Sequence, residues 1–381
     1  MPSVLPKLFL KRLRHAIRSR LLPWFSQNAR ALPWRETHRS PYAVWISEIM
    51  LQQTRVDTVI PYYQRFLVRF PDPAALATAP LRDVLKLWEG LGYYTRARQI
   101  HKTAQILVRN HGGQLPANPD QLAALPGLGP YTTAAIGSFA FGLPLAVLDG
   151  NVIRVLSRLF ALTDDVTRPA TRKRLQKLAD NLLLPDRPAA VNEAWMELGA
   201  LICTPRAPRC NECPLRGICR AAQRKTPEAY PRKKKKMPIP HKIVGAAVIL
   251  NTKNQILIAQ RKPEGGLLAG LWEFPGGKVA EGESLPGCIV RELMEEMGIL
   301  LEVGPHLVTV HHAYSHFTIE LHAYFARIRT GRPRHLDCAD HAWVSCGEFD
   351  DYPFSKADLE IIRAIRALPR PPVYRDYFGN K

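Results

Sequence analysis

The stretch "LPGLGPYTTAAIGSFAFG", residues 125–142, decides how the first half of the chain folds. Its Gly-x-Gly pair, Gly127 and Gly129, predicts a tight hairpin between the end of one helix and a new helix opened by Thr132 and Thr133. Such a hairpin presents backbone N–H groups at a helix N-terminus, which suits a DNA phosphate and reads no base sequence. The stretch therefore predicts a helix-hairpin-helix element that contacts DNA.

An aspartate follows this hairpin. Twenty residues after Gly129, the sequence "VLDGNVIRVLSRL" (147–159) places Asp149 directly before another helix. By itself such an Asp is an ordinary helix N-cap. Over residues 8–222, apolar residues recur at helical spacing between Pro and Gly, and strand-like alternation is scarce. The first half of the chain is therefore expected to be all-α.

Charge divides the 381 residues into two unlike parts. The whole chain carries a net charge of +20, yet residues 243–381 contain 15 Lys/Arg and 17 Asp/Glu. The basic excess of +22 therefore lies in residues 1–242 and indicates a polyanion-binding half. No apolar run approaches the ~18 residues of a membrane span. The 7 cysteines lack the spacing of a secreted disulfide framework and favour a reducing, cytoplasmic compartment.

Further motifs make the first half resemble a known family. The stretch "PWRETHRSPYAVWISEIMLQQTRVDTVIPYYQRF" (33–66) contains "SEIMLQQT" (47–54), and "GLGYY" follows at 90–94. Together with the hairpin and Asp149, the chain from about Leu32 to Cys219 resembles the MutY-type adenine DNA glycosylases of base excision repair. The resemblance implies hydrolysis of the N-glycosidic bond of adenine mispaired with 8-oxoguanine or guanine.

The resemblance assigns chemistry to four residues. Glu48 lies among apolar neighbours, where burial would raise its pKa and keep a proton available for adenine N7. Asp149 would stabilise the sugar cation that forms as the bond breaks, and Asn151 would orient it. Bifunctional relatives have Lys where Tyr131 stands. Because tyrosine cannot form an imine with the sugar, the enzyme is expected to be monofunctional.

The same resemblance places further residues around the extruded adenine. Trp34, Arg35 and Glu193 would form the adenine pocket, while Gln53 and Tyr93 would wedge into the double helix. For Trp34 and Tyr93 the alternative is packing in the core. The expected partner is double-stranded DNA, bound by a monomer.

Four cysteines form a second constellation. Cys203, Cys210, Cys213 and Cys219 have the spacing C-x6-C-x2-C-x5-C. Zinc is the general interpretation of a C-x2-C pair, although zinc motifs usually contain two such pairs. The spacing is similar to that of the [4Fe-4S] cluster in the same glycosylases, and it implies this cofactor in a structural and DNA-docking role.

The composition indicates two domains and a linker. Residues 1–222 would form the helical glycosylase domain. Residues 223–241 are rich in Pro and Lys, so they would be either a DNA-contacting tether or a soluble spacer. Residues 242–381 combine strand-like runs at 242–251, 255–262 and 316–328 with one helix, which indicates an α+β domain.

That helix carries a complete motif. The stretch "GGKVAEGESLPGCIVRELMEEMGI" (276–299) matches the Gly-x5-Glu-x7-Arg-Glu-U-x-Glu-Glu-x-Gly-U box (U, apolar) of the Nudix pyrophosphohydrolases. Glu292, Glu295 and Glu296 fall on one helix face, where Mg²⁺ or Mn²⁺ would offset their repulsion. The domain therefore resembles MutT. Either the box is a silent scaffold, or the domain still hydrolyses oxidised purine nucleoside triphosphates.

The resemblance also gives the C-terminal domain a role on DNA. In these glycosylases a MutT-like domain recognises 8-oxoguanine through a loop with a Phe-Ser-His motif. Here "HHAYSHF" supplies Tyr314, Ser315 and His316, which would recognise the lesion. Asp358 stands where MutT-like enzymes commonly have a base-reading Asn, and this leaves open the nucleobase that the domain accepts.

The sequence thus favours a monofunctional adenine DNA glycosylase with a C-terminal Nudix-fold domain. One alternative is a fusion whose main added activity is 8-oxo-dGTP-type pyrophosphohydrolysis. The other is a protein that finds lesions without cutting. The carboxylates of Glu48 and Asp149 argue against both alternatives. A helical half that only held the protein on DNA would need no paired acids at these positions.

Overall fold

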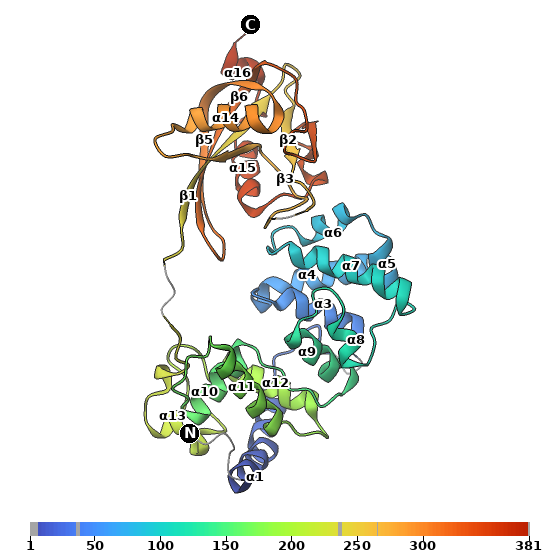
Figure 1. Ribbon diagram of the computed structural model, residues 1–381, viewed down its shortest axis with the longest axis vertical. Helices are drawn as coiled ribbons and strands as arrows, with labels where there is room; N and C mark the ends of the chain where they lie inside the picture. Colours follow the sequence, from blue (N-terminus) through green and yellow to red (C-terminus); the bar gives the residue numbers. More distant parts are fainter. Residues whose placement is uncertain (1–6, 36–38, 235–237, 265, 380–381) are drawn as a thin grey trace. The chain divides into compact units, whose positions relative to one another are not determined.

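The chain folds into two compact units (Figure 1). The computed structural model describes residues 7–35, 39–234, 238–264 and 266–379. The first unit comprises Met1–Ala77 and Lys102–Lys236, and the second comprises Thr78–His101 and Met237–Lys381. The domain limits expected from the sequence remain a prediction, and residues 235–237 of the expected linker lie outside the described residues.

The described residues of the first unit form helices joined by turns and loops, with no strand among them, as expected. Its elements are α1 (Lys7–Ala16), η1 (Ile17–Leu21), α2 (Leu22–Asn28), α3 (Pro41–Leu51), α4 (Val56–Arg69), α5 (Pro73–Thr78), α8 (Pro119–Ala123), α9 (Pro130–Phe141), α10 (Gly150–Phe160), α11 (Pro169–Leu182), α12 (Pro188–Leu201), η2 (Arg216–Ile218), α13 (Arg220–Gln223) and η3 (Pro227–Ala229). One core joins Leu13 of α1, Leu156 of α10 and Leu198 of α12, each of which is fully buried. Burying such a side chain contributes about 1.5–3 kcal/mol, so this core stabilises the helices that carry the site.

The expected hairpin lies between α8 and α9. Gly127 has a φ of +79°, in the left-handed region that favours glycine. Gly129 has an ordinary φ of −76° and precedes α9 as its N-cap. The interpretation that both glycines permit the turn is therefore wrong for Gly129. A side chain at Gly129 would meet no atom within 4 Å, so glycine here keeps the backbone accessible. The helix also begins at Pro130, two residues before Thr132.

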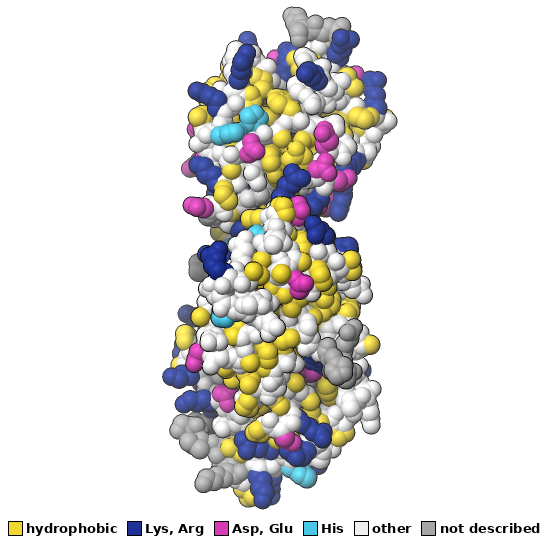
Figure 2. Space-filling model, turned by 90° about the vertical axis from the view of Figure 1, so that its right-hand side faces the viewer, with side chains coloured by type: hydrophobic (Ala, Val, Ile, Leu, Met, Phe, Trp, Pro, Cys, Tyr) yellow, Lys and Arg dark blue, Asp and Glu magenta, His cyan; other side chains and the backbone are white. Residues whose placement is uncertain are grey.

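Basic side chains are prominent on the surface of the first unit. Figure 2 shows Lys and Arg gathered at the end of the unit where α1 lies. Helix α1 contributes the exposed residues Lys11, Arg12 and Arg14 to this end. Such a surface suits a polyanion. No helix in the described ranges combines the length and apolarity that crossing a bilayer requires.

The second unit contains a mixed sheet of seven strands (Figure 1). Its elements are α6 (Leu81–Trp88), β1 (His241–Leu250), β2 (Ile256–Gln260), β3 (Trp272–Glu273), β4 (Gly276–Lys278), α14 (Leu285–Met297), β5 (Leu300–Ala313), β6 (Thr318–Thr330), β7 (Asp340–Val344), η4 (Glu348–Asp351), α15 (Lys356–Arg366) and α16 (Tyr374–Phe378). The strand order is β3-β2-β1-β6-β5, with β4 paired to β1 and β7 paired to β2. Strands β1 and β6 are parallel, and β1 and β2, which match two of the expected strand-like runs, pair antiparallel. The combined α/β architecture expected for this part is confirmed.

Helices cover both faces of the sheet. Successive side chains of β1 point to opposite faces, so each face has a core that a helix can cover. Val248 and Leu250 face a core that includes Ile361 of α15. Ala247 and Ile249 face the other core, which includes residues of α14. Both helices lie over the sheet in Figure 1. This packing holds the helix of the Nudix box against β1.

Residues 78–101 also belong to the second unit. Lys86 Nζ donates to the Tyr352 carbonyl at 2.9 Å, and the Tyr94 hydroxyl donates to the Phe354 carbonyl at 2.8 Å. The Phe354 N–H donates to Glu89 Oε1 at 2.8 Å. Helix α7 (Thr95–Asn110) begins in this unit, and the division between the units falls within it.

Candidate active site

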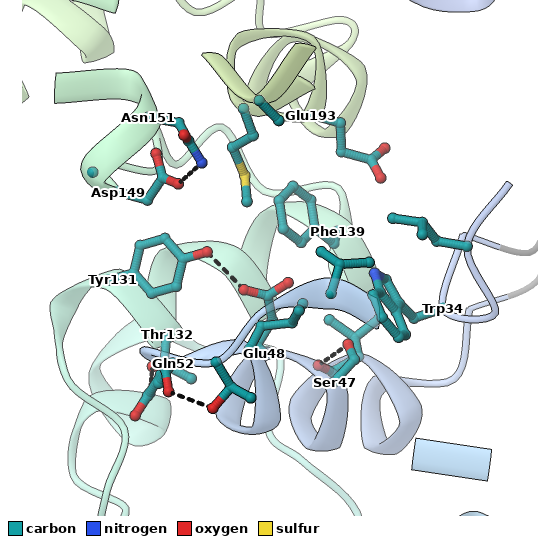
Figure 3. A pocket seen from close by; sticks show the side chains of 18 of the residues that line it. Trp34, Ser47, Glu48, Gln52, Tyr131, Thr132, Phe139, Asp149, Asn151 and Glu193 are labelled. Carbon is teal, nitrogen blue, oxygen red and sulfur yellow. Dashed lines mark hydrogen bonds between the residues drawn. The ribbon is translucent and has the colours of Figure 1, made fainter. Parts of the chain in front are cut away.

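A cavity of about 780 Å³ in the first unit gathers most of the expected site residues (Figure 3). The expected residues that line it are Trp34, Arg35, Glu48, Gln53, Gly127, Gly129, Tyr131, Asp149, Asn151 and Glu193. They come from α3, the hairpin, α9, α10 and α12, and from the segments beside these elements. Tyr93 belongs to the second unit and does not line this cavity.

Glu48 has the environment of a proton donor. It lies on α3, whose start is capped by Ser40: the hydroxyl accepts from the Ala43 N–H at 3.0 Å. Only 4% of Glu48 is exposed, and the Tyr131 hydroxyl donates to its Oε2 at 2.8 Å. The pKa of Glu48 is raised to about 7: burial is the main cause, the Tyr131 hydrogen bond lowers the pKa, and the charge of Asp149 raises it. This carboxyl group therefore holds a proton in a large part of the molecules near neutral pH.

Asp149 both caps a helix and faces the cavity. Its Oδ1 accepts from the Val152 N–H at 2.7 Å, which makes it the N-cap of α10. Its Oδ2 accepts from Asn151 Nδ2 at 2.9 Å. Burial raises the pKa of Asp149, whereas these two hydrogen bonds favour its charged form. The cap thus orients the carboxylate toward the cavity (Figure 3).

Sequence reasoning missed a network of charges in the cavity wall. Arg35 contacts Glu193 at 3.2 Å and Glu197 at 2.8 Å, and Arg30 contacts Glu197 at 2.7 Å. The Glu197 side chain is fully buried. Burial opposes its ionisation, but hydrogen bonds from Arg30 and Arg35 outweigh this effect and hold its pKa at about 2. The i,i+4 spacing of the two glutamates in "NEAWMELG" was the available signal.

The two expected wedge residues have unusual backbone conformations. Gln53 has a φ of +58° and Tyr93 a φ of +51°, in the left-handed region. This conformation costs about 1–2 kcal/mol for a residue with a side chain. The preceding Gln52 is fixed by its hydrogen bond to Thr132 Oγ1 at 3.1 Å. Trp34 is 8% exposed and packs edge-on against Tyr63, so it serves core packing and also lines the cavity.

Comparisons with known proteins identify the family. The model of the HhH-GPD superfamily base excision DNA repair proteins matches residues 46–181, and the NUDIX domain model matches residues 245–364. The chain is 35% identical to the adenine DNA glycosylase of Rattus norvegicus, over 91% of the chain and 77% of that protein. The chain belongs to the adenine DNA glycosylase family. It is a DNA glycosylase whose C-terminal part has a Nudix-like fold.

Other matches agree with this assignment. The adenine DNA glycosylase of Homo sapiens is 36% identical, over 92% of the chain and 74% of that protein. The adenine DNA glycosylase of Schizosaccharomyces pombe is 31% identical, over 93% of the chain and 90% of that protein. A solved thermostable thymine-DNA glycosylase has a TM-score of 0.52 and 29% identity, covering 56% of the chain and 98% of that structure. This likeness supports the glycosylase fold of the helical part.

The four cysteines of this glycosylase share one small cavity. Cys203, Cys210, Cys213 and Cys219 are half-buried free thiols that line it. Arg158 and Arg216 line the same cavity, and Arg158 Nη1 donates to the Cys203 sulfur at 3.3 Å. Burial chiefly raises the pKa of Cys213 to about 12, and the other three cysteines add to this effect. A bound cation or cluster would therefore favour the ionised form of the Cys213 thiol.

The four thiols supply the donors that an iron–sulfur cluster needs, and the same donors also suit a zinc ion. The four cysteines therefore fit a metal centre at the cavity that they line.

The Nudix box is built as its pattern requires. Arg291 Nε donates to Glu283 Oε1 at 2.7 Å, which ties the loop to α14. Arg291 Nη1 also donates to Glu292 Oε1 at 3.0 Å and to Glu295 Oε2 at 3.2 Å. A side chain at Gly277 would collide with the Glu292 carboxylate, which explains the glycine of the motif. The loop and the helix are thus locked together.

The expected metal ligands of the box do not converge in this structure. Glu292, Glu295 and Glu296 are absent from the described groups whose ligand atoms lie within 4.8 Å. Burial chiefly, together with the charges of Glu273 and Glu292, raises the pKa of Glu296 to about 8. The donor set fits a hard divalent cation, whose binding would displace the proton of Glu296.

The expected lesion-reading residues differ in exposure. Ser315 and His316 are exposed between β5 and β6, whereas Tyr314 is half-buried and packs against the core. The Tyr314 ring contacts Phe317 at a centroid distance of 4.8 Å. Asp358 is buried and accepts from the Phe274 N–H at 3.1 Å. Its other oxygen accepts from the Ser355 hydroxyl at 2.6 Å, so both carboxylate oxygens are used within the fold.

Proposed function

We propose that the enzyme removes adenine mispaired with 8-oxoguanine or guanine from double-stranded DNA, by hydrolysing the N-glycosidic bond. One observation carries this proposal: the buried Glu48, with a pKa of about 7, shares one cavity with the capped carboxylate of Asp149. This hydrolysis requires one acid that can give a proton and a second acid that remains charged. Membership of the adenine DNA glycosylase family supports adenine as the base.

The first step is extrusion of the base. A duplex hides the glycosidic bond, so the nucleotide must leave the stack and enter a pocket. The cavity of about 780 Å³ is large enough for an adenine with its sugar. Trp34, Arg35 and Glu193 would bind the base, and Gln53 and Tyr93 would fill the space that it leaves in the duplex. The helix-hairpin-helix N–H groups beside Gly127 and Gly129 would hold the phosphates.

Bond cleavage then divides the work between two carboxyl groups. Glu48 gives its proton to adenine N7, so that neutral adenine departs with the electron pair of the C1′–N9 bond. Asp149 stays anionic and stabilises the sugar cation, and Asn151 keeps it oriented. Water adds to C1′ and releases a proton, which leaves an abasic site. Tyr131 cannot form an imine, so no strand cleavage accompanies this step.

The remaining parts would serve recognition. Cys203, Cys210, Cys213 and Cys219 would hold a [4Fe-4S] cluster that supports the basic loop around it, and the enzyme would act as a cytoplasmic monomer. Among the expected lesion-reading residues, exposure favours Ser315 and His316 for contact with 8-oxoguanine, with Tyr314 as their anchor in the core.

A second activity is favoured by one observation. Glu296 is a partly buried acid whose pKa of about 8 reflects repulsion from Glu273 and Glu292 as well as burial. Mg²⁺ or Mn²⁺ at Glu292, Glu295 and Glu296 would relieve this repulsion and supply the Lewis acid for pyrophosphohydrolysis of an oxidised purine nucleoside triphosphate.

Labelled duplexes test the main proposal. Adenine should be released from duplexes with 8-oxoguanine or guanine opposite it, and not from an adenine–thymine pair. The abasic strand should break only after alkali or heat. Release of another base in preference to adenine would contradict the proposal.

A further inference from the structure

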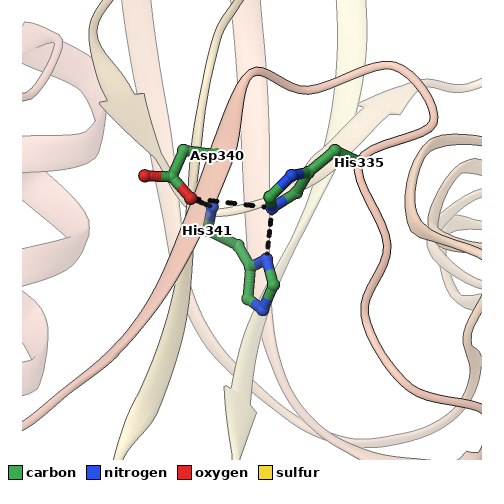
Figure 4. Close-up of side chains that lie close together, drawn as sticks. All are labelled: His335, Asp340 and His341. Atoms are coloured by element: carbon green, nitrogen blue, oxygen red, sulfur yellow. Dashed lines mark hydrogen bonds and ion pairs between the residues drawn. The ribbon is translucent and has the colours of Figure 1, made fainter.

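Three metal-ligating side chains that do not belong to the Nudix box meet on the second unit (Figure 4). His335 lies in the segment between β6 and β7, and Asp340 and His341 begin β7. His335 Nε2 lies 2.7 Å from His341 Nδ1 and 3.6 Å from Asp340 Oδ1. Among the residues that the structure describes, this is the group whose His, Cys, Asp or Glu ligand atoms all lie within 4.8 Å of one another.

The backbone around the three side chains is anchored on both sides. The N–H groups of Leu336 and Asp337 each donate to the Glu296 carbonyl at 3.1 Å. The Ala339 N–H donates to the Gln260 carbonyl at 2.8 Å, and β7 continues this pairing along β2. The sequence brings the ligands within six residues of one another, and these hydrogen bonds fix the turn that joins them. The site is therefore largely formed before any ion binds.

The chemistry of the donors defines the class of ion. The two facing ring nitrogens share one hydrogen bond, so one of them carries a hydrogen; an ion would replace this hydrogen, and the remaining hydrogens would then lie on His335 Nδ1 and His341 Nε2. Asp340 adds a carboxylate oxygen. Two imidazoles with one carboxylate suit zinc and neighbouring transition metals, whereas Mg²⁺ and Ca²⁺ prefer oxygen donors. Nearby Cys338 packs against the core of α14 and is not a fourth ligand.

The geometry requires only a small adjustment. Zn–N bonds of about 2.0–2.1 Å in a tetrahedral site place the two nitrogens about 3.3 Å apart, so the rings would separate by about 0.6 Å. The side chains of His335 and Asp340 are 44% and 56% exposed, which leaves them room to move. Exposure also leaves a coordination position open to water or to another ligand.

We propose that His335, Asp340 and His341 bind one divalent transition-metal ion of the zinc class. The ion would clip the segment after β6 to the start of β7. Because this segment is hydrogen-bonded to the Glu296 carbonyl, the ion would also restrain the end of α14. The imidazole donors of this site prefer a different class of ion from the carboxylates of the Nudix box, which suit a hard ion.

The test is zinc binding to the tag-free, full-length, cluster-loaded protein. Calorimetry and metal analysis should be run on wild type, on the double variant His335→Gln/His341→Gln, and on His15→Gln. His15 is an exposed histidine on α1 and serves as the matched control. Iron is measured in every sample, so that zinc replacing iron at the cysteines is recognised. Wild type and His15→Gln should bind one more zinc ion than the double variant.

Two further measurements make the test decisive. Asp340→Asn should weaken zinc binding by about tenfold or more, because one ligand loses its charge. Binding should also weaken at acidic pH, because protons compete with the metal ion for the imidazole nitrogens. Melting temperatures without zinc should match across the variants, since the substituted groups lie at the surface. Equal zinc stoichiometry and affinity in wild type and the double variant would overturn the proposal.

Discussion

The Tyr131 hydroxyl donates a hydrogen bond to Glu48 Oε2 at 2.8 Å, and this bond joins helices α9 and α3 at the cavity. Its effect on Glu48 opposes that of burial. Burial raises the pKa of Glu48 to about 7, whereas a hydrogen bond to the charged form lowers it. Tyr131 thus adjusts the acidity of the proposed general acid.

Glu48→Gln should abolish adenine release while mismatch binding persists. The amide keeps the shape of the side chain but has no acidic proton to give to N7. A single-turnover assay should show a loss of at least about 10²–10⁴-fold, the usual contribution of a general acid. Glu302→Gln, at an exposed glutamate of the second unit, should excise adenine normally. Substantial excision by Glu48→Gln would remove Glu48 from this role.

Tyr131→Phe should shift the pH dependence of excision. In wild type the rate should fall as the pH rises through about 7, because the active form of Glu48 is protonated. Removing the hydroxyl removes a bond that lowers this pKa, so the fall should move to higher pH. Tyr42→Phe also removes a buried hydroxyl from α3, which donates to the Phe70 carbonyl, and should leave the profile unchanged. A profile that moves to lower pH in Tyr131→Phe would contradict this account.

The cysteine spacing predicts about four irons per chain in anaerobically purified protein. Cys213→Ser should lose most of the iron, because its thiol is a buried part of the proposed ligand set. Cys288→Ser changes a buried thiol of the second unit and should retain full iron content. Stoichiometric zinc without iron in the wild-type protein would instead establish a zinc site.

The sequence predicted the elements of this protein better than its charge networks. Asp149 was identified because two signals coincided. It stands directly before a helix, as an N-cap does, and it lies at the family's distance from the Gly-x-Gly hairpin. Glu197 was missed because its burial depends on Arg30 and Arg35, which lie more than 160 residues away in the sequence. His335 and His341 were missed because their approach depends on a turn fixed by hydrogen bonds to Glu296 and Gln260, two neighbours in space.

Ser315→Ala should reduce the preference for 8-oxoguanine over guanine opposite the adenine. The exposed hydroxyl is a candidate hydrogen-bond partner of the lesion, and its loss should cost about two- to tenfold in relative excision rate. Ser26→Ala, at an exposed serine of α2, should leave the preference intact. An unchanged rate ratio in Ser315→Ala would assign lesion reading to other residues.

Glu296→Gln should abolish any pyrophosphohydrolase activity of the full-length protein and leave adenine excision intact, because the glycosylase carboxylates lie in the other unit. Pyrophosphate release from 8-oxo-dGTP is best measured with Mg²⁺ and with Mn²⁺ in a Glu48→Gln background. The metal must displace the proton of Glu296, whose pKa is about 8, so less metal should be needed as the pH rises toward 8. Glu281→Gln changes an exposed glutamate at a variable box position and should remain active. If the parent protein releases no pyrophosphate with either ion, the Arg291 network serves only to hold α14 in place, and the domain acts on lesions in DNA alone.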